Sequence, residues 1–160
     1  MTRLSEIELM LNSLIPVDMQ SDNLVTMDML KIGVVDTCSS IGVNDLLFEP
    51  VTETDEEGNE QVIDYIITPD LTLAQQRLAS YYSYILYLEK LKLVLNNDAI
   101  NFSTLTFSIK GLEKRPEAIN DMIYTAKRYL SDYQDRLTGS DAILGNATQF
   151  GSSSGGDYYG

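Results

Sequence analysis

Apolar side chains recur every three or four positions in four segments of the chain, and this spacing predicts helices that each bury one face. The first predicted helix is short. Ser5 and Glu8 fit a capping box at its start, and Pro16 stops it. Its apolar positions are Leu4, Ile7, Leu11 and Leu14.

The second predicted helix begins near Ser21 and Asp22, either of which could cap it, and Gly42 is its expected C-terminal stop. Its apolar stripe consists of Met27, Leu30, Val34, Cys38 and Ile41. A glycine inside a helix costs about 1 kcal/mol relative to alanine. We therefore expect another helix to approach closely at Gly33. Cys38 is predicted to act as a small buried hydrophobic residue.

The third and fourth helices are the longest predicted elements. Thr68, Pro69 and Asp70 supply a cap, a first-turn proline and an early acid for a helix that runs to about Asn96. The last helix starts near Pro116 and is expected to end at Gly139. The apolar positions are Leu71, Ala74, Leu78, Tyr81, Ile85, Leu88 and Leu95 in the third helix, and Ile119, Met122, Ile123, Ala126, Leu130, Tyr133 and Leu137 in the fourth.

Two stretches have the alternating pattern or the turn signals of strands. Leu105 to Ile109 alternates apolar and polar residues, which predicts a half-buried strand. The 27 residues from Val43 to Pro69 are too many for a structureless loop. Gly58 and Asn59 at their centre predict a hairpin with strands Phe48–Thr54 and Gln61–Ile67. A two-stranded ribbon is marginal alone, so we expect it to lie against a partner surface.

The composition changes after residue 138. Positions 139–160 hold six of the ten glycines and include the run GSSSGG, so we expect a segment that does not fold alone. The predicted domain organisation is a helical domain over 1–138, with an extended arm over 43–69, and a Gly/Ser-rich C-terminal tail over 139–160. The predicted fold class is mostly α: a small helical bundle with one long central helix, a protruding β-hairpin arm and a flexible tail.

The charge and the missing residue types exclude several functions. The 160 residues include 24 Asp and Glu, 11 Lys and Arg, no His and one Cys, with a formal net charge of −13. Nucleophile pairs that use histidine and thiolate zinc clusters are therefore excluded. A strongly negative chain lacks the basic patches that bind nucleic-acid backbones. The longest uncharged apolar stretch, Leu78 to Leu88, is too short to span a membrane. We predict a protein that is not an enzyme and that needs no cofactor or metal.

Two charged clusters could be sites. The acidic run from Glu53 to Glu60 could bind calcium, but it lacks the alternating acids of a helix-loop-helix site, so a solvated hairpin tip is favoured. The one basic cluster is Lys110, Lys114 and Arg115. A turn between strand and helix is favoured there over nucleic-acid binding, and these residues could pair with acids of a neighbouring subunit such as Glu56 and Glu57.

The tyrosines predict an interface. Four of the ten lie close together at Tyr81, Tyr82, Tyr84 and Tyr87, and they cannot all face one core. Tyrosine is enriched where a protein surface is buried against another protein. Core filling is the alternative. The further residues that we expect at subunit or partner contacts are Phe48, Ile66, Phe150, Tyr158 and Tyr159.

The order of the predicted elements resembles the head–tail connector proteins of tailed bacteriophages, also called adaptor or head-completion proteins. The residues that carry this resemblance are the long helix TPDLTLAQQRLASYYSYILYLEKLKLVL and the following FSTLTFSIKGLEKRPEAINDMIYTAKRYL. The similarity spans about residues 20–137. It rests on the pattern of elements, and the acidic arm over 43–69 departs from it.

The resemblance implies a structural virion protein at the neck, assembled in the host cytoplasm. Such proteins form a ring of about a dozen copies that joins the portal to the tail and extends the DNA channel. The implied partners are further copies, the portal protein and the tail-proximal neck proteins, with DNA passing through unbound. The alternative hypothesis is an acidic regulator or DNA mimic that binds a basic site on a nucleic-acid enzyme. A metal-dependent enzyme that uses the carboxylates is a third, less favoured hypothesis.

The charge is distributed unevenly along the chain. The arm over 43–69 holds eight of the 24 acids and no Lys or Arg, while eight of the 11 basic residues lie from Lys90 onward. Opposite charges at different places on identical subunits favour head-to-tail contacts, which can close into a ring.

Overall fold

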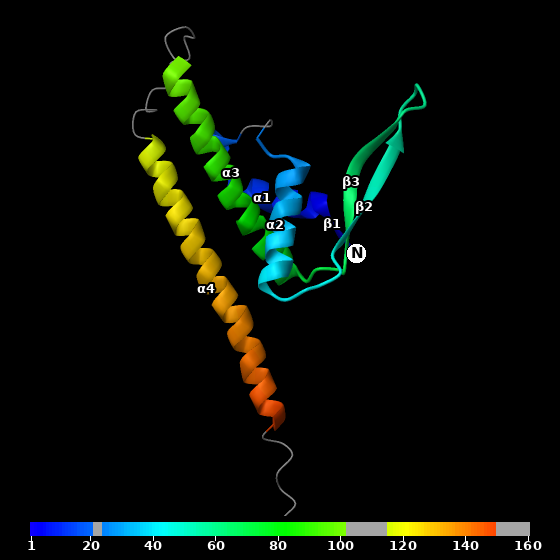
Figure 1. Cartoon of the computed structure of the whole chain (residues 1–160), viewed down its shortest axis with the longest axis vertical. Coiled ribbons are helices and arrows are strands. Elements are labelled where there is room, and N and C mark those ends of the chain that lie inside the picture. The colour runs from blue at the N-terminus through cyan, green and yellow to red at the C-terminus, as the bar shows by residue number, and fades with distance from the viewer. Residues whose placement is uncertain (21–23, 102–114, 150–160) are drawn as a thin grey trace, which may run out of the picture.

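The computed structural model describes residues 1–20, 24–101 and 115–149, and the chain is mostly helical with a small three-stranded antiparallel sheet (Figure 1). This confirms the predicted predominance of helices. The elements in order are β1 (Thr2–Arg3), α1 (Leu4–Leu14), the 3-10 helix η1 (Val17–Met19), α2 (Met27–Ser40), β2 (Leu47–Thr54), β3 (Glu60–Thr68), α3 (Leu73–Asn101) and α4 (Arg115–Gln149).

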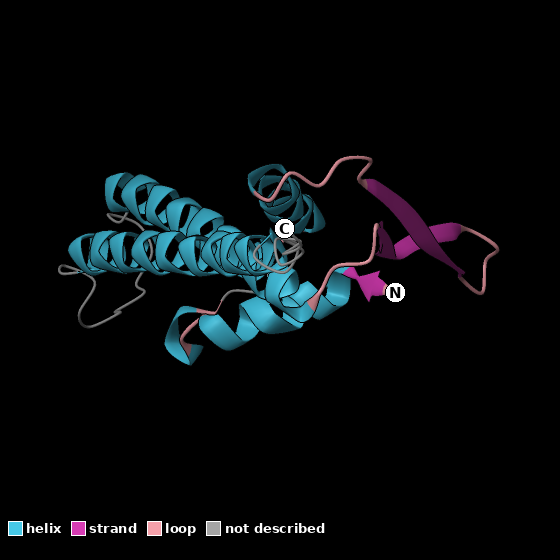
Figure 2. Ribbon diagram, turned by 90° about the horizontal axis from the view of Figure 1, so that it is seen from below, coloured by secondary structure: helices cyan, strands magenta, loops and turns pink. Residues whose placement is uncertain are grey.

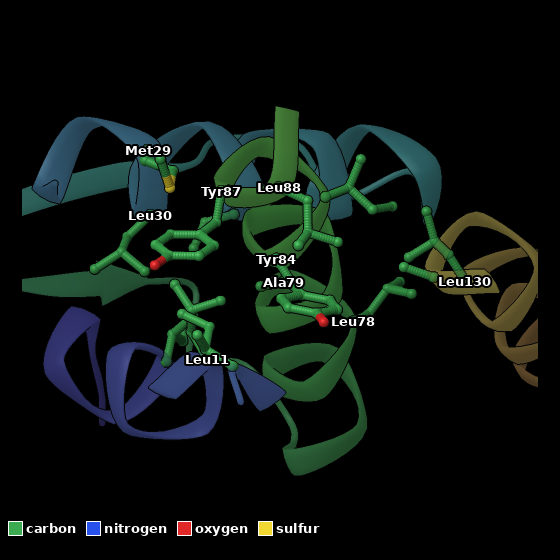
Figure 3. Packing of buried hydrophobic residues seen from close by; sticks show 14 of the residues in the cluster. Leu11, Met29, Leu30, Leu78, Ala79, Tyr84, Tyr87, Leu88 and Leu130 are labelled. Carbon is green, nitrogen blue, oxygen red and sulfur yellow. The ribbon is translucent and has the colours of Figure 1, made fainter. Parts of the chain in front are cut away.

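The hydrophobic core forms along α3, which packs against α1, α2 and α4. Figure 3 shows Leu78, Ala79, Tyr84, Tyr87 and Leu88 of α3 meeting Leu11 of α1, Met29 and Leu30 of α2, and Leu130 of α4. All of these side chains are buried. Because three helices contact α3 from different sides, its apolar residues extend round most of its surface. Cys38 is buried among them, as predicted, and burial raises the pKa of its thiol.

Helix α1 is not capped by the predicted pair Ser5 and Glu8. The helix starts at Leu4, so the acid in capping position is Glu6, whose carboxylate accepts a hydrogen bond from the Arg3 N–H at 3.2 Å. Ser5 instead donates its N–H and its hydroxyl to Asp64 in β3, at 3.1 and 2.7 Å. The start of α1 is therefore held by a local acid, Glu6, and by a distant one, Asp64.

Helix α2 starts later than predicted and ends where predicted. It begins at Met27, after the N-cap Thr26, whose hydroxyl oxygen accepts from the Met29 N–H at 3.3 Å. The expected start near Ser21 and Asp22 is therefore wrong, because the apolar stripe begins only at Met27. The helix ends at Ser40, and Gly42 follows with φ 71°, a conformation that favours glycine.

Helix α3 also begins later than its predicted cap. Thr72 and Gln75 cap it reciprocally: the Thr72 N–H donates to the Gln75 side chain at 2.9 Å, and the Gln75 N–H donates to the Thr72 hydroxyl at 3.3 Å. The expected cap at Thr68–Pro69–Asp70 is wrong because Asp70 is engaged elsewhere. Its carboxylate accepts from the Thr2 hydroxyl and from the Met1 amine, the latter at 2.7 Å. The helix runs to Asn101, beyond the predicted end near Asn96.

Helix α4 starts at Arg115, close to the predicted Pro116, but it does not stop at Gly139. It continues to Gln149, and Gly139 does not have the positive φ of a C-terminal stop. Each interior glycine costs about 1 kcal/mol, and this helix of 35 residues contains two, Gly139 and Gly145. The predicted boundary between domain and tail therefore does not coincide with the end of the helix. The described residues do not include the predicted strand Leu105–Ile109 or Lys110, Lys114, Phe150, Tyr158 and Tyr159.

The sheet has the order β1-β3-β2, with both pairs antiparallel. The predicted strands Phe48–Thr54 and Gln61–Ile67 are present, slightly longer than expected, and β1 is an addition that the sequence pattern did not indicate. Phe48 pairs with Ile67, and a β-bulge lies between Val51 and Thr52. Figures 1 and 2 show the far end of the β2–β3 hairpin leading away from the helices.

The predicted close contact at Gly33 is confirmed. A Cβ atom added there would lie 2.2 Å from Ser83 Oγ and 2.8 Å from the Ala79 carbonyl oxygen, both in α3. The carbonyl belongs to the backbone and cannot rotate away. Helices α2 and α3 can therefore approach this closely only because position 33 has no side chain.

We predict that Gly33→Ala destabilises the fold by about 1–3 kcal/mol, because the overlap with Ser83 and Ala79 exceeds the gain in helix propensity. The matched control is Gly139→Ala in α4, where an added Cβ would meet nothing within 4 Å. That variant should match the parent or exceed it by up to about 1 kcal/mol. Urea unfolding followed by circular dichroism measures both. A Gly33→Ala protein as stable as the parent would contradict the close crossing.

Candidate functional site

The base of the β2–β3 hairpin is fixed to the helices by a buried carboxylate. Asp64 of β3 is 7% exposed and accepts hydrogen bonds from the Ser5 N–H, the Ser5 hydroxyl and the Tyr65 N–H. Ser5 lies in the first turn of α1, where a carboxylate also interacts favourably with the helix dipole. Asp64 therefore joins the strand to the helix and satisfies donors at the start of α1.

A cation–π contact fixes the same part of the hairpin to α2. The Lys31 ammonium lies 3.5 Å from the ring centroid of Tyr65 and 5.9 Å from that of Phe48. Phe48, which we predicted at a contact, is half-buried at this position, and Ile66 is half-buried in β3 opposite Arg3. Both predicted residues thus contact elements of their own chain. Lys31 is a residue that the sequence reasoning missed.

The outer half of the hairpin carries exposed apolar and acidic side chains. Val62 and Ile63 are 42% and 49% exposed. The acids Glu53, Glu56, Glu57 and Glu60 are exposed, and none of them forms an ion pair within the described ranges. No Lys or Arg lies between Val43 and Pro69 to neutralise them. The hairpin therefore presents an uncompensated negative charge beside exposed aliphatic groups.

The tip of the hairpin is held by Asp55. Its carboxylate accepts from the Asn59 N–H at 2.8 Å, the Glu57 N–H at 3.0 Å and the Asn59 side-chain amide at 3.2 Å. Gly58 has φ 87°, which the turn requires. The hydrogen bonds from Asn59 are the main cause that lowers the pKa of Asp55 below its ordinary value. The run that we weighed as a calcium site is therefore a hydrogen-bonded turn.

The tyrosines of α3 lie mainly within the chain. Tyr87 is fully buried and its hydroxyl donates to the Met19 carbonyl, while Tyr84 is 8% exposed and burial raises its pKa. The core-filling alternative accounts for these two residues, which are not accessible to a partner. Tyr81 and Tyr82 are half-buried, and the Tyr82 hydroxyl accepts from Gln134 of α4 at 2.6 Å. Of the four tyrosines predicted at an interface, only Tyr81 and Tyr82 therefore remain partly accessible to a partner.

The most exposed tyrosines among the described residues lie on α4. Tyr124 and Tyr129 are 72% and 60% exposed, and they surround a shallow depression together with Thr125, Arg128 and Asp132. We call Tyr124, Arg128 and Tyr129 the α4 patch. The sequence reasoning missed it, although the signal is present: both tyrosines fall outside the apolar stripe that contains Ile119, Ala126 and Leu130.

The hairpin and the α4 patch are the two exposed features among the described residues that stand out by charge and by aromatic side chains. In the described ranges, no group of three or more His, Cys, Asp or Glu side chains is placed to hold a metal ion. None of the described helices is long and apolar enough to cross a membrane. The chain matches no known family model, no curated protein and no solved structure. The candidate functional sites are the exposed hairpin and the α4 patch.

We predict that Asp64→Ala lowers the free energy of unfolding by about 1–3 kcal/mol, because it leaves the Ser5 N–H and hydroxyl without an acceptor. Glu60→Ala on the same strand is the control, since Glu60 is exposed and should change stability by less than about 0.5 kcal/mol. Urea unfolding and amide hydrogen exchange in β3 measure the effect. Equal losses in the two variants would refute the anchoring role of Asp64.

We predict that the hairpin tip loses order only in acid. The pKa of Asp55 is lowered in the folded state, so its contribution is complete above the ordinary carboxyl pKa and disappears as the pH falls through the lowered value. A nuclear magnetic resonance titration of the Asn59 amide should show a midpoint below about 3.9. Asp55→Ala should abolish this transition. A midpoint at or above the ordinary value would be inconsistent with the hydrogen-bonded turn.

Proposed function

We propose that this chain is a structural subunit of the head–tail connector of a tailed bacteriophage, which forms a ring between the portal and the tail. The observation that carries the proposal is the placement of two unlike surfaces on opposite sides of one body: the β2–β3 hairpin on one side and α4 on the other (Figure 1). Head-to-tail contacts between two unlike surfaces of identical subunits close into a ring when the rotation from one subunit to the next permits closure.

The order of the elements supports the same proposal. The helices form a bundle around α3 as the body of the subunit, and the hairpin is an arm that protrudes from it. The long helix followed by a further segment and the closing helix α4 is the pattern that resembles connector proteins. The residues after α4, with Phe150, Tyr158 and Tyr159, contact the portal or a neighbouring copy in this proposal.

The charge of the chain suits a channel for DNA. A net charge of −13 gives little attraction for phosphates, since attraction depends on basic groups that release counterions. DNA can then pass through the ring without binding. The subunit acts as a scaffold and performs no catalysis, which fits a chain that has no histidine. Its place is the neck of the virion, after assembly in the host cytoplasm.

The test is co-expression with the portal protein encoded nearest to its gene, followed by native mass spectrometry and negative-stain electron microscopy. We expect a ring of about a dozen copies that is bound to the portal. The matched control is the same portal protein expressed alone, which should lack the additional ring. Mass spectrometry gives the number of copies, and microscopy gives the position of the ring at the portal.

A monomer that does not bind the portal would contradict the proposal. The alternative function, an acidic regulator or DNA mimic, predicts a different result: a monomer or dimer that binds a basic nucleic-acid enzyme tightly and in a salt-sensitive manner. The observation that favours this alternative is the exposure of the acids at the hairpin tip, since a basic site on an enzyme would attract them.

A further inference from the structure

We infer that the β2–β3 hairpin of one copy docks onto the α4 patch, Tyr124, Arg128 and Tyr129, of the next copy. This inference rests on the proposed ring and identifies the contact between its subunits. It assigns a role to the acidic hairpin, which departs from the connector pattern, and to the exposed tyrosines of α4.

The hairpin offers a surface of mixed character. Its outer half exposes the aliphatic side chains of Val62 and Ile63 and the acids at its tip, including Glu56 and Glu57. An interface that buries such a surface needs apolar groups for the aliphatic side chains and a cation for the carboxylates. The occupant must therefore combine large apolar side chains with positive charge.

The α4 patch has this combination. Tyr124 and Tyr129 expose their rings, and Arg128 between them forms no ion pair with any described residue. The neighbouring Lys127 is bound to Glu89 at 3.1 Å. Both cations lie between the flanking acids Asp121 and Asp132, and Asp132 lines the depression together with Arg128. Tyrosine and arginine are, with tryptophan, the residue types enriched among those that dominate binding energy at interfaces.

The geometry requires two copies. The hairpin and α4 lie on opposite sides of the body, and neither hairpin strand contacts α4 (Figures 1 and 2). Asp64 and Lys31 fix the base of the hairpin to α1 and α2, so the hairpin cannot fold back across the body. The complementary surfaces can therefore meet only between chains. A contact of this type is heterologous, and its repetition generates a ring when the rotation between neighbouring subunits closes.

The first experiment reverses the charge of the patch. Arg128→Glu should weaken self-association of the full chain by at least about tenfold in analytical ultracentrifugation. Arg77→Glu is the matched control, because Arg77 is also exposed, belongs to α3 and not to the hairpin or α4, and gives the same change in net charge. The control should stay within about threefold of the parent. Circular dichroism melting curves check that both variants are folded.

The second experiment reverses both sides. A chain with Glu56→Arg and Glu57→Arg should also associate poorly by itself. Mixing it with the Arg128→Glu chain should restore association, because each hairpin then faces an α4 patch of opposite charge. Native mass spectrometry should show complexes with equal numbers of the two variants. This restoration cannot result from a general loss of stability in either chain.

The results separate this inference from the proposed function. A parent chain that remains monomeric at about 1 mM overturns the inference, and so do variants that associate like the parent or fail to restore each other. If those variants still form rings on the portal, the connector proposal stands with a different subunit contact. If the variants behave as expected but the parent does not bind the portal, the hairpin–α4 contact is correct and the connector proposal fails.

Discussion

The close crossing of α2 and α3 at Gly33 is the constraint on which the rest of the structure depends. Because position 33 has no side chain, the two helices approach until their backbones nearly touch. Lys31 lies half a turn before this point, so the crossing also determines where its ammonium meets Tyr65 at the base of the hairpin. Helix α4 packs against another side of α3. The crossing, together with the Asp64–Ser5 hydrogen bonds, therefore fixes the hairpin relative to the helix that packs against α4.

The helices could be predicted because their apolar periodicity is a local property of the sequence. The local caps at Thr26 and at Thr72 with Gln75 were missed, although their partners lie only three residues away. The roles of Ser5 and Asp70 could not be predicted, since their hydrogen-bond partners are far away in the chain. Ser5 bonds to Asp64, 59 positions away, and Thr2 bonds to Asp70, 68 positions away. Such pairs leave no local signal. The rule that glycine stops a helix succeeded at Gly42, where φ is positive, and failed at Gly139, where it is not.

The candidate surfaces were predicted less completely than the fold. The acidic hairpin could be identified because its turn signal and its charge are both local. The role of the tyrosines could not, because their number does not reveal which of them face the core. Tyr87 is fully buried because other helices pack against α3 on the side that carries it. Tyr124 lies on α4 and is 72% exposed. Only the packing of the helices separates these two environments.

A fixed body with an acidic hairpin on one side and a tyrosine–arginine patch on the other is well suited to head-to-tail assembly. A cryo-electron microscopy reconstruction of the chain assembled with its portal protein tests this account most directly. We expect a ring in which the hairpin of each subunit lies against Tyr124, Arg128 and Tyr129 of the next. A ring in which the hairpins contact no neighbouring α4, or a portal without a ring, would contradict the account.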